Sequence, residues 1–249
     1  MLKSLTVPLL FFVLLSTACT TSTLQIDQAA TYIPTASSQA AEQADHFWWQ
    51  FRFKLQWPDG EPPAFSNHLL IADQIIAPTL VEYGDNVGLW RLHRRAGRDQ
   101  TGHQLSLIFY ANEATANAVA ASMDAKPLTQ WLRNQDMIEA TRFSRRTGEE
   151  LARMEDTSDG EWPMEIQRSW PYFIMGVSQT WLAMVQELSG NDPLSGEVDY
   201  NAFVAHYQTV DNKLTTQWRD FGQHAYLHHL SAVFGYQPLK LRNTELRSF

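Results

Sequence analysis

Cysteine is almost absent from this chain, since Cys19 is the only one in 249 residues. A single thiol cannot form an internal disulfide, so this cysteine does not stabilise the fold by cross-linking it. Positive charge is also scarce: 19 Lys and Arg residues stand against 27 Asp and Glu residues, for a formal net charge of −8. Such an acidic chain argues against a nucleic-acid partner and against broad electrostatic adhesion to anionic lipid.

The apolar run near the N-terminus is too short to span a membrane. It covers 5–15, roughly ten residues, whereas a spanning helix needs about 20. Lys3 precedes it and the small residues 16–18 follow it, which is the pattern of a cleaved export signal. The segment Leu15-Ser16-Thr17-Ala18-Cys19 resembles the lipobox of bacterial lipoproteins, in which the cysteine is lipidated and becomes the first residue of the mature chain.

This resemblance implies where in the cell the protein is located. Residues 1–18 are then a signal peptide, and Cys19 carries fatty acyl chains such as palmitate that hold the protein on a membrane. Residues 19–44 are rich in Ser, Thr, Ala and Gln and predict a flexible tether. By the sorting rule of the family, Thr20 in place of Asp implies a periplasm-facing lipoprotein of the outer membrane. The alternative is an ordinary cleaved signal followed by a chance cysteine.

Aromatic residues are plentiful, with nine Trp, thirteen Phe and eight Tyr, so the chain beyond residue 44 can bury a substantial core. The segment 46–57 alternates aromatic and polar residues with a period of two, which predicts a half-buried strand. Further elements of 45–146 follow from periodicity and from Pro, Gly and Asn positions. They are a helix to Tyr83 that Asn67 or Ser66 caps and Pro78 kinks or divides, strands at 87–95 and 103–110, a short helix capped by Asn112, a short helix from Pro127 to Leu132, and a strand at 137–145.

This order, βαββαβ, predicts an α+β domain with a ferredoxin-like antiparallel sheet over 45–146. The remainder, 147–249, predicts a charged loop and then two long helices packed on that domain. The first helix runs from Trp170-Pro171 to Leu188 and ends at Gly190. The second runs from Asp199 to Phe234, and with about 1.5 Å per residue it should cross the sheet or project past it.

Basic side chains gather in the predicted sheet. If the aromatic residues of 46–57 face the helices, a second group of side chains points to the opposite face. This group predicts a site for an anion or a partner, and it consists of Arg52, Lys54, Arg91, His93, Arg95, Gln104, Ser106 and Tyr110. The structural alternative is that the C-terminal helices cover this face and that their carboxylates, or those of the loop, pair with the arginines.

His224 and His228 are four residues apart on one predicted helix, so both imidazoles lie on one face, as a metal site requires. A third ligand, His206 or a carboxylate, would have to come from elsewhere in the fold. Two histidines on the flank of a packed helix are the structural alternative, and the sequence favours it.

Two classes of function remain. The first is a non-catalytic lipoprotein that binds an unidentified periplasmic or outer-membrane partner, or a small ligand, and needs no cofactor. The second is a metal-binding protein or enzyme built on His224 and His228. The first is favoured because the sequence contains no complete set of catalytic residues or metal ligands.

Overall fold

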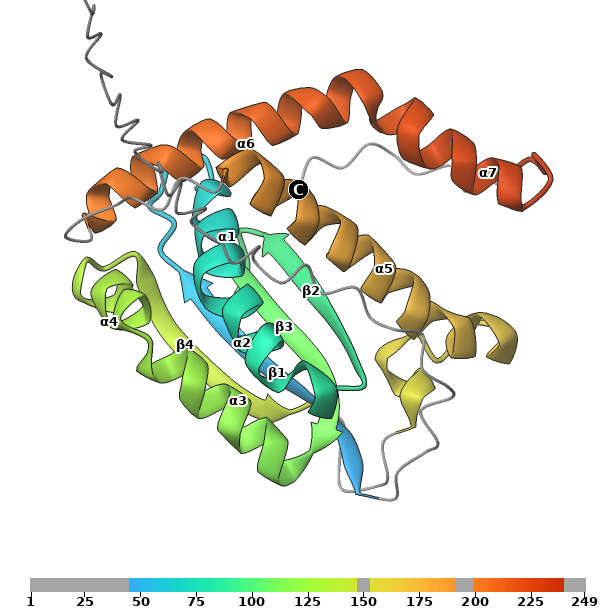
Figure 1. The fold of residues 1–249 in the computed structure, drawn as a ribbon, viewed down its shortest axis with the longest axis horizontal. Helices are drawn as coiled ribbons and strands as arrows, with labels where there is room; N and C mark the ends of the chain where they lie inside the picture. The colour runs from blue at the N-terminus through green and yellow to red at the C-terminus, as the bar shows by residue number, and fades with distance from the viewer. Residues whose placement is uncertain (1–44, 147–152, 191–198, 240–249) are drawn as a thin grey trace, which may run out of the picture. The chain divides into compact units, whose positions relative to one another are not determined.

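Four strands form one antiparallel sheet in the computed structural model, which describes residues 45–146, 153–190 and 199–239 (Figure 1). The strands are β1 (His46–Leu55), β2 (Leu89–Ala96), β3 (His103–Asn112) and β4 (Ile138–Arg145), in the order β2-β3-β1-β4. The fold is therefore mixed α+β, with all four predicted strands present. The predicted signal 1–18, Cys19 and the tether 19–44 lie outside the described residues.

Two groups of helices cover one face of the sheet (Figure 1). The first group is α1 (Ser66–Ile71), η1 (Ala72–Ile76) and α2 (Ala77–Tyr83), followed by the short η2 (Gly84–Asn86). The second group is α3 (Glu113–Ala125) and α4 (Pro127–Asn134). The predicted cap of α3 is confirmed, because Asn112 Oδ1 accepts a hydrogen bond from Thr115 N at 2.8 Å.

Pro78 divides its helix as predicted. Proline has no N–H and its ring clashes with the carbonyl four residues earlier, so it tends to kink or interrupt an α-helix. The chain responds with the π-helical turn η1 just before Pro78, which starts α2. The predicted cap of α1 is wrong: Phe65 occupies the N-cap position without a side-chain hydrogen bond, while Ser66 and Asn67 are buried in the first turn.

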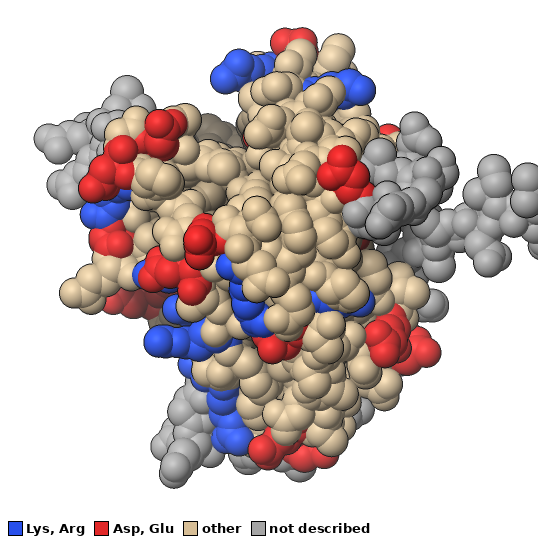
Figure 2. Space-filling view, turned by 90° about the vertical axis from the view of Figure 1, so that its left-hand side faces the viewer, with Lys and Arg blue, Asp and Glu red and all other residues tan. Residues whose placement is uncertain are grey.

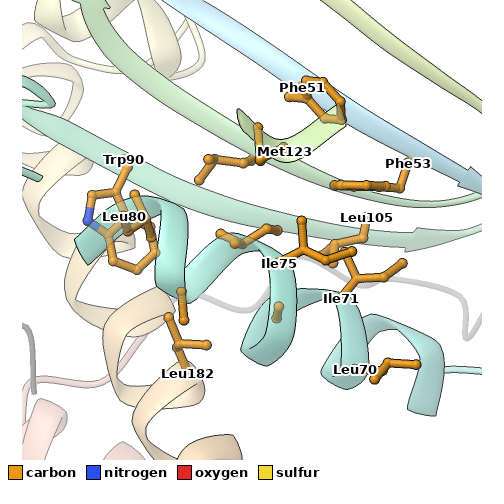
Figure 3. Packing of buried hydrophobic residues seen from close by; sticks show 14 of the residues in the cluster. Phe51, Phe53, Leu70, Ile71, Ile75, Leu80, Trp90, Leu105, Met123 and Leu182 are labelled. Carbon is orange, nitrogen blue, oxygen red and sulfur yellow. The ribbon is translucent and has the colours of Figure 1, made fainter. Parts of the chain in front are cut away.

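The core lies between the sheet and these helices. Phe51 and Phe53 of β1 point toward Ile71 and Ile75 of the facing helix, and Met123 of α3 belongs to the same core cluster (Figure 3). Trp49 is buried beside them, and its indole Nε1 donates to the carbonyl of Ala111 at 2.9 Å. Burying one large apolar side chain contributes roughly 1.5–3 kcal/mol, so each of these residues stabilises the packing of the helices on the sheet.

Long helices follow the sheet, as the sequence predicts, with one displaced start. η3 (Met154–Thr157) precedes α5 (Met164–Ser189), and a continuous helical run is made by α6 (Tyr200–Gly222), η4 (Gln223–His228) and α7 (His229–Val233). α5 begins at Met164 instead of at Trp170-Pro171, because Pro163 takes the N-cap position and Pro171 is accommodated inside the helix. No helix within the described ranges is long and apolar enough to cross a membrane.

The C-terminal helices pack beside the sheet and not over its second face. α5 lies along β2, where the backbone N–H of Leu92 donates to Ser178 Oγ at 3.0 Å. α6 lies against α1 (Figure 1). There Tyr207 donates a hydrogen bond to the buried carboxylate of Asp73, and Gln74 Nε2 donates to the Tyr207 hydroxyl at 2.7 Å.

Apolar side chains of the helical run from α6 to α7 are buried only in its first half. Tyr207, Val210 and Leu214 lie in the core, whereas Trp218 and Phe221 are 52% and 63% exposed. The helical run thus projects past the sheet, as its length predicts.

The contact between Tyr207 and Asp73 provides a test of how α6 is docked. Replacing Tyr207 by Phe removes the hydroxyl and leaves a buried carboxylate with a single donor, so we expect unfolding to need about 1–3 kcal/mol less. Urea denaturation followed by circular dichroism measures this loss. Tyr236→Phe removes an exposed hydroxyl and should change the free energy of unfolding by less than about 0.5 kcal/mol. Equal effects of the two variants would contradict the docking role of Tyr207.

Candidate functional site

The second face of the sheet carries rows of cationic side chains that run across the strands. Each residue pairs with its neighbours in the antiparallel register, so the members of one row are adjacent. The rows, written from β2 to β4, are Arg91–Ile108–Gln50–Ser144, His93–Ser106–Arg52–Arg142 and Arg95–Gln104–Lys54–Ala140. We call the set Arg52, Lys54, Arg91, His93, Arg95, Arg142 and Arg146 the cationic face.

All the residues predicted to share this face do share it, because the period-two pattern of β1 holds throughout the strand. Tyr110 differs from the others in its surroundings. It lies at the end of the face, 2% exposed, in a small apolar cluster with Trp48, Leu89 and Ile108. Its role in binding, like that of the arginines, stays a prediction.

Two of the cations on this face are neutralised by carboxylates. Lys54 Nζ lies 2.6 Å from Glu139 Oε1, and Arg95 forms an ion pair with Asp99 in the turn after β2. These pairs sit at the end of the sheet where β2 stops and β4 starts. A cavity of about 400 Å³ lies at that end, lined by Lys54, Asp99, Glu139 and neighbouring residues.

The central arginines have neutral partners. Arg91 Nε donates to Thr157 Oγ1 of η3 at 3.0 Å, and Arg52 Nη2 donates to Gln50 Oε1 at 3.1 Å. Arg52 Nε is buried and has no hydrogen-bond partner in the described part of the chain. Within residues 45–146, 153–190 and 199–239, no carboxylate forms an ion pair with Arg52, Arg91, Arg142 or Arg146.

Mutual repulsion is visible in the pKa values of these groups. Burial lowers the pKa of Arg91 to about 10, and the charge of Arg146 adds to this effect. Burial also lowers the pKa of Arg146, with Arg52 contributing. The pKa of His93 is lowered by burial and then by Arg91, Arg146, Arg95 and Arg52. The positive charges are therefore close enough to disfavour one another.

The cationic face is partly accessible to solvent. Arg142 and Arg146 are exposed, Arg52 and His93 are half-buried, and Arg91 is 9% exposed. Seen from the side on which β4 lies in Figure 1, Lys and Arg side chains gather in the lower half of the molecule (Figure 2). A ligand can thus contact the exposed Arg142 and Arg146 directly, whereas Arg91 is buried.

A second group of titratable residues, which the sequence did not suggest, is buried beside the sheet. The rings of His68 and His103 have centroids 4.5 Å apart, and Phe65 lies edge-on to both. Arg94 Nε donates to His68 Nδ1 at 3.3 Å, and its guanidinium lies over the Trp181 ring. His68 Nε2 and both ring nitrogens of His103 are buried without hydrogen-bond partners in the described part.

The electrostatics of this pair keep it uncharged. The pKa of His68 is far below its usual value because of burial, Arg94 and His103, in that order. Burial and Arg94 lower the pKa of His103 as well. Asp211 acts on Arg94 with the opposite charge, and its own pKa is raised by burial. The positive charge of Arg94 thus adds to burial in favouring the neutral form of both rings.

His224 and His228 lie on η4, fully exposed, with ring centroids 5.5 Å apart and His229 close to both. His206 bonds to the carbonyl of Ser189 instead of joining them. Among the residues that the structure describes, no group of three or more His, Cys, Asp or Glu side chains is arranged to hold a metal ion. The third ligand that the metal hypothesis needs is therefore missing from these ranges.

The buried histidines predict a loss of stability in acid. Their pKa values are lowered in the folded state, so near pH 6 the unfolded chain binds protons that the folded chain does not. The stabilisation is complete above about pH 6.5 and is lost as the pH falls toward the folded pKa values. We expect the free energy of unfolding to decrease between pH 7.5 and pH 5 in urea titrations.

His103→Leu is the variant that tests the origin of this decrease. It removes one of the two titrating groups with a lowered pKa, so the dependence on pH should become shallower. His228→Leu changes an exposed histidine and serves as the control. A pH dependence that is the same in wild type and His103→Leu would show that other groups cause the acid sensitivity.

Comparisons with known proteins give no family for this chain. No protein-family model, no curated protein and no solved structure matches it. A functional conclusion therefore depends on the chemistry of the cationic face and on the N-terminal sequence.

Proposed function

We propose that this protein is a bacterial lipoprotein, held on the periplasmic side of the outer membrane through Cys19, with a non-catalytic binding or scaffolding role. The lipobox-like segment 15–19 supports the anchor, because the single cysteine of the chain stands where lipidation needs it. Several acyl chains on one residue give stable attachment where one chain does not.

The cationic face is the surface through which the protein would bind its ligand or partner. The observation that carries this role is the cluster of arginines without carboxylate partners in the described residues, on a chain with a net charge of −8. Like charges held together at a half-buried site cost stability unless an anion compensates them. Binding accounts for this arrangement better than packing, which would have favoured neutral side chains.

The strand order also supports a finer description of the fold. In a ferredoxin-like sheet the two βαβ units interlock, which places β1 and β3 in the centre and β2 and β4 at the edges. The order β2-β3-β1-β4 agrees with that plan, so we propose a ferredoxin-like domain over 45–146. Such folds host many unrelated functions, and the proposal of a binding role therefore rests on the residues of the face.

The anchor is tested by replacing Cys19 with Ser. In a bacterial host that lipidates exported proteins, we expect wild type in the outer-membrane fraction and Cys19→Ser outside it. Mass spectrometry of the purified wild-type protein should show acyl chains on Cys19 at the N-terminus. An unmodified thiol, or a mature chain that starts after residue 19, would refute the proposed anchor.

The role of the cationic face is tested separately, with the anchor intact. Chemical cross-linking in membranes, followed by affinity purification, should capture a partner with wild type and with Arg219→Gln. Arg219 is exposed on α6, so its loss changes the net charge equally but leaves the face untouched. Arg52→Gln should reduce the captured amount by roughly tenfold, the effect of one charge-assisted hydrogen bond. Equal capture by wild type, Arg219→Gln and Arg52→Gln would show that the cationic face is not the binding surface.

A further inference from the structure

The cationic face contains a compact group of charged side chains at its centre, Arg52, Arg91, His93 and Arg146, which we call the cradle. His93 and Arg52 lie in one row on either side of Ser106, which is itself fully buried, so a ligand would meet the longer side chains. Arg91 stands beside His93 on the same side of β2, two residues earlier. Arg146 acts electrostatically on Arg91 and His93, which places its charge near both.

The hydrogen-bonding capacity of this cradle is incompletely used. Arg52 uses Nη2 on Gln50, and its buried Nε has no partner in the described residues. Arg91 uses Nε on Thr157. Donors without acceptors, in a group of positive charges, fit a ligand made only of acceptor oxygens.

We propose that Arg52, Arg91, His93 and Arg146 bind the phosphate group of a ligand, as a phosphomonoester or a group of the same shape and charge. A tetrahedral dianion offers acceptor oxygens in several directions, which suits guanidinium groups that converge from β1, β2 and the end of β4. The inference rests on the proposed function, because it names the ligand of the same face.

Charge supports a dianion over a monoanion. Three guanidinium groups meet here, and the described carboxylates at the rim are already paired with Lys54 and Arg95. A bound dianion leaves a net charge of +1 on the three arginines and the ligand together. Protonation of His93 adds a fourth positive charge, which is favourable only when an anion is bound. Binding of the dianion should therefore take up a proton on His93, and its affinity should increase as the pH falls.

Sulfate is the probe that isolates this effect, because it stays a dianion between pH 6 and pH 8 while phosphate itself titrates. Calorimetric titration of the full lipidated chain in neutral detergent, at constant ionic strength, should show binding that is roughly tenfold tighter at pH 6 than at pH 8. His93→Gln should bind with an affinity that no longer depends on pH. Circular dichroism at both pH values verifies that each chain is folded.

Charge variants test the arginines. Arg146→Gln is exposed and should fold normally, and it should weaken sulfate binding by roughly tenfold. Arg52→Gln should have a similar effect, while the matched control Arg219→Gln should bind like wild type. The inference is overturned by undetectable sulfate binding, by equal weakening in Arg219→Gln, or by a pH dependence that survives in His93→Gln.

The source of the phosphate group is resolved by competition against sulfate. Glycerol 3-phosphate and a short-chain phosphatidic acid carry the same phosphomonoester, one free and one on a lipid. Stronger competition by the lipid identifies a headgroup ligand, and equal competition identifies a soluble one. If neither competes, the site does not accept phosphomonoesters and the proposal fails, although the membrane anchor at Cys19 would stand.

Discussion

The register of β1 in the middle of the sheet is the constraint on which the rest of the structure depends. Its alternation sends Trp49, Phe51 and Phe53 into the core and Gln50 and Arg52 to the other face. A shift of one residue would put arginine in the core and phenylalanine outside, so no neighbouring register competes. Because β3 and β4 both pair with β1, this alternation sets the position of every side chain on both faces.

The sequence predicts most of the sheet because its signals are local. Aromatic alternation marks β1, and the polar turn between β2 and β3 marks the hairpin. Asn112 marks the start of α3 because its side-chain carbonyl oxygen accepts a hydrogen bond from a free backbone N–H. Pro78 marks a break in its helix because proline has no backbone N–H to donate. The sequence does not determine the start of α5. Pro163 and Pro171 both suit the first turn of a helix, and only packing decides between them.

Long-range contacts explain what the sequence does not reveal. The cationic side chains are predictable, because the period of a strand assigns their face. Their lack of carboxylate partners within the described residues is not predictable, since it depends on where α5 and α6 pack. His68 and His103 are separated by 34 positions, and neither stands in a recognisable motif. Their ring contact results from the way α1 crosses the start of β3, so only the three-dimensional structure brings them together.

The C-terminal helices, as far as the structure describes them, leave the arginines of the second face without carboxylate partners. Had α5 covered the second face, its carboxylates would have neutralised the charges and made them part of the core. Instead, α5 protects the edge strand β2, where the hydroxyl of Ser178 accepts from the N–H of Leu92.

η3 covers only the apolar end of the second face. There Trp48 Nε1 donates to the carbonyls of Arg153 and Met154, and Thr157 reaches Arg91 with a neutral hydroxyl. A hydroxyl orients a guanidinium without cancelling its charge. The fold thus holds Arg91 in place through a neutral partner, and no carboxylate of the described residues cancels its positive charge.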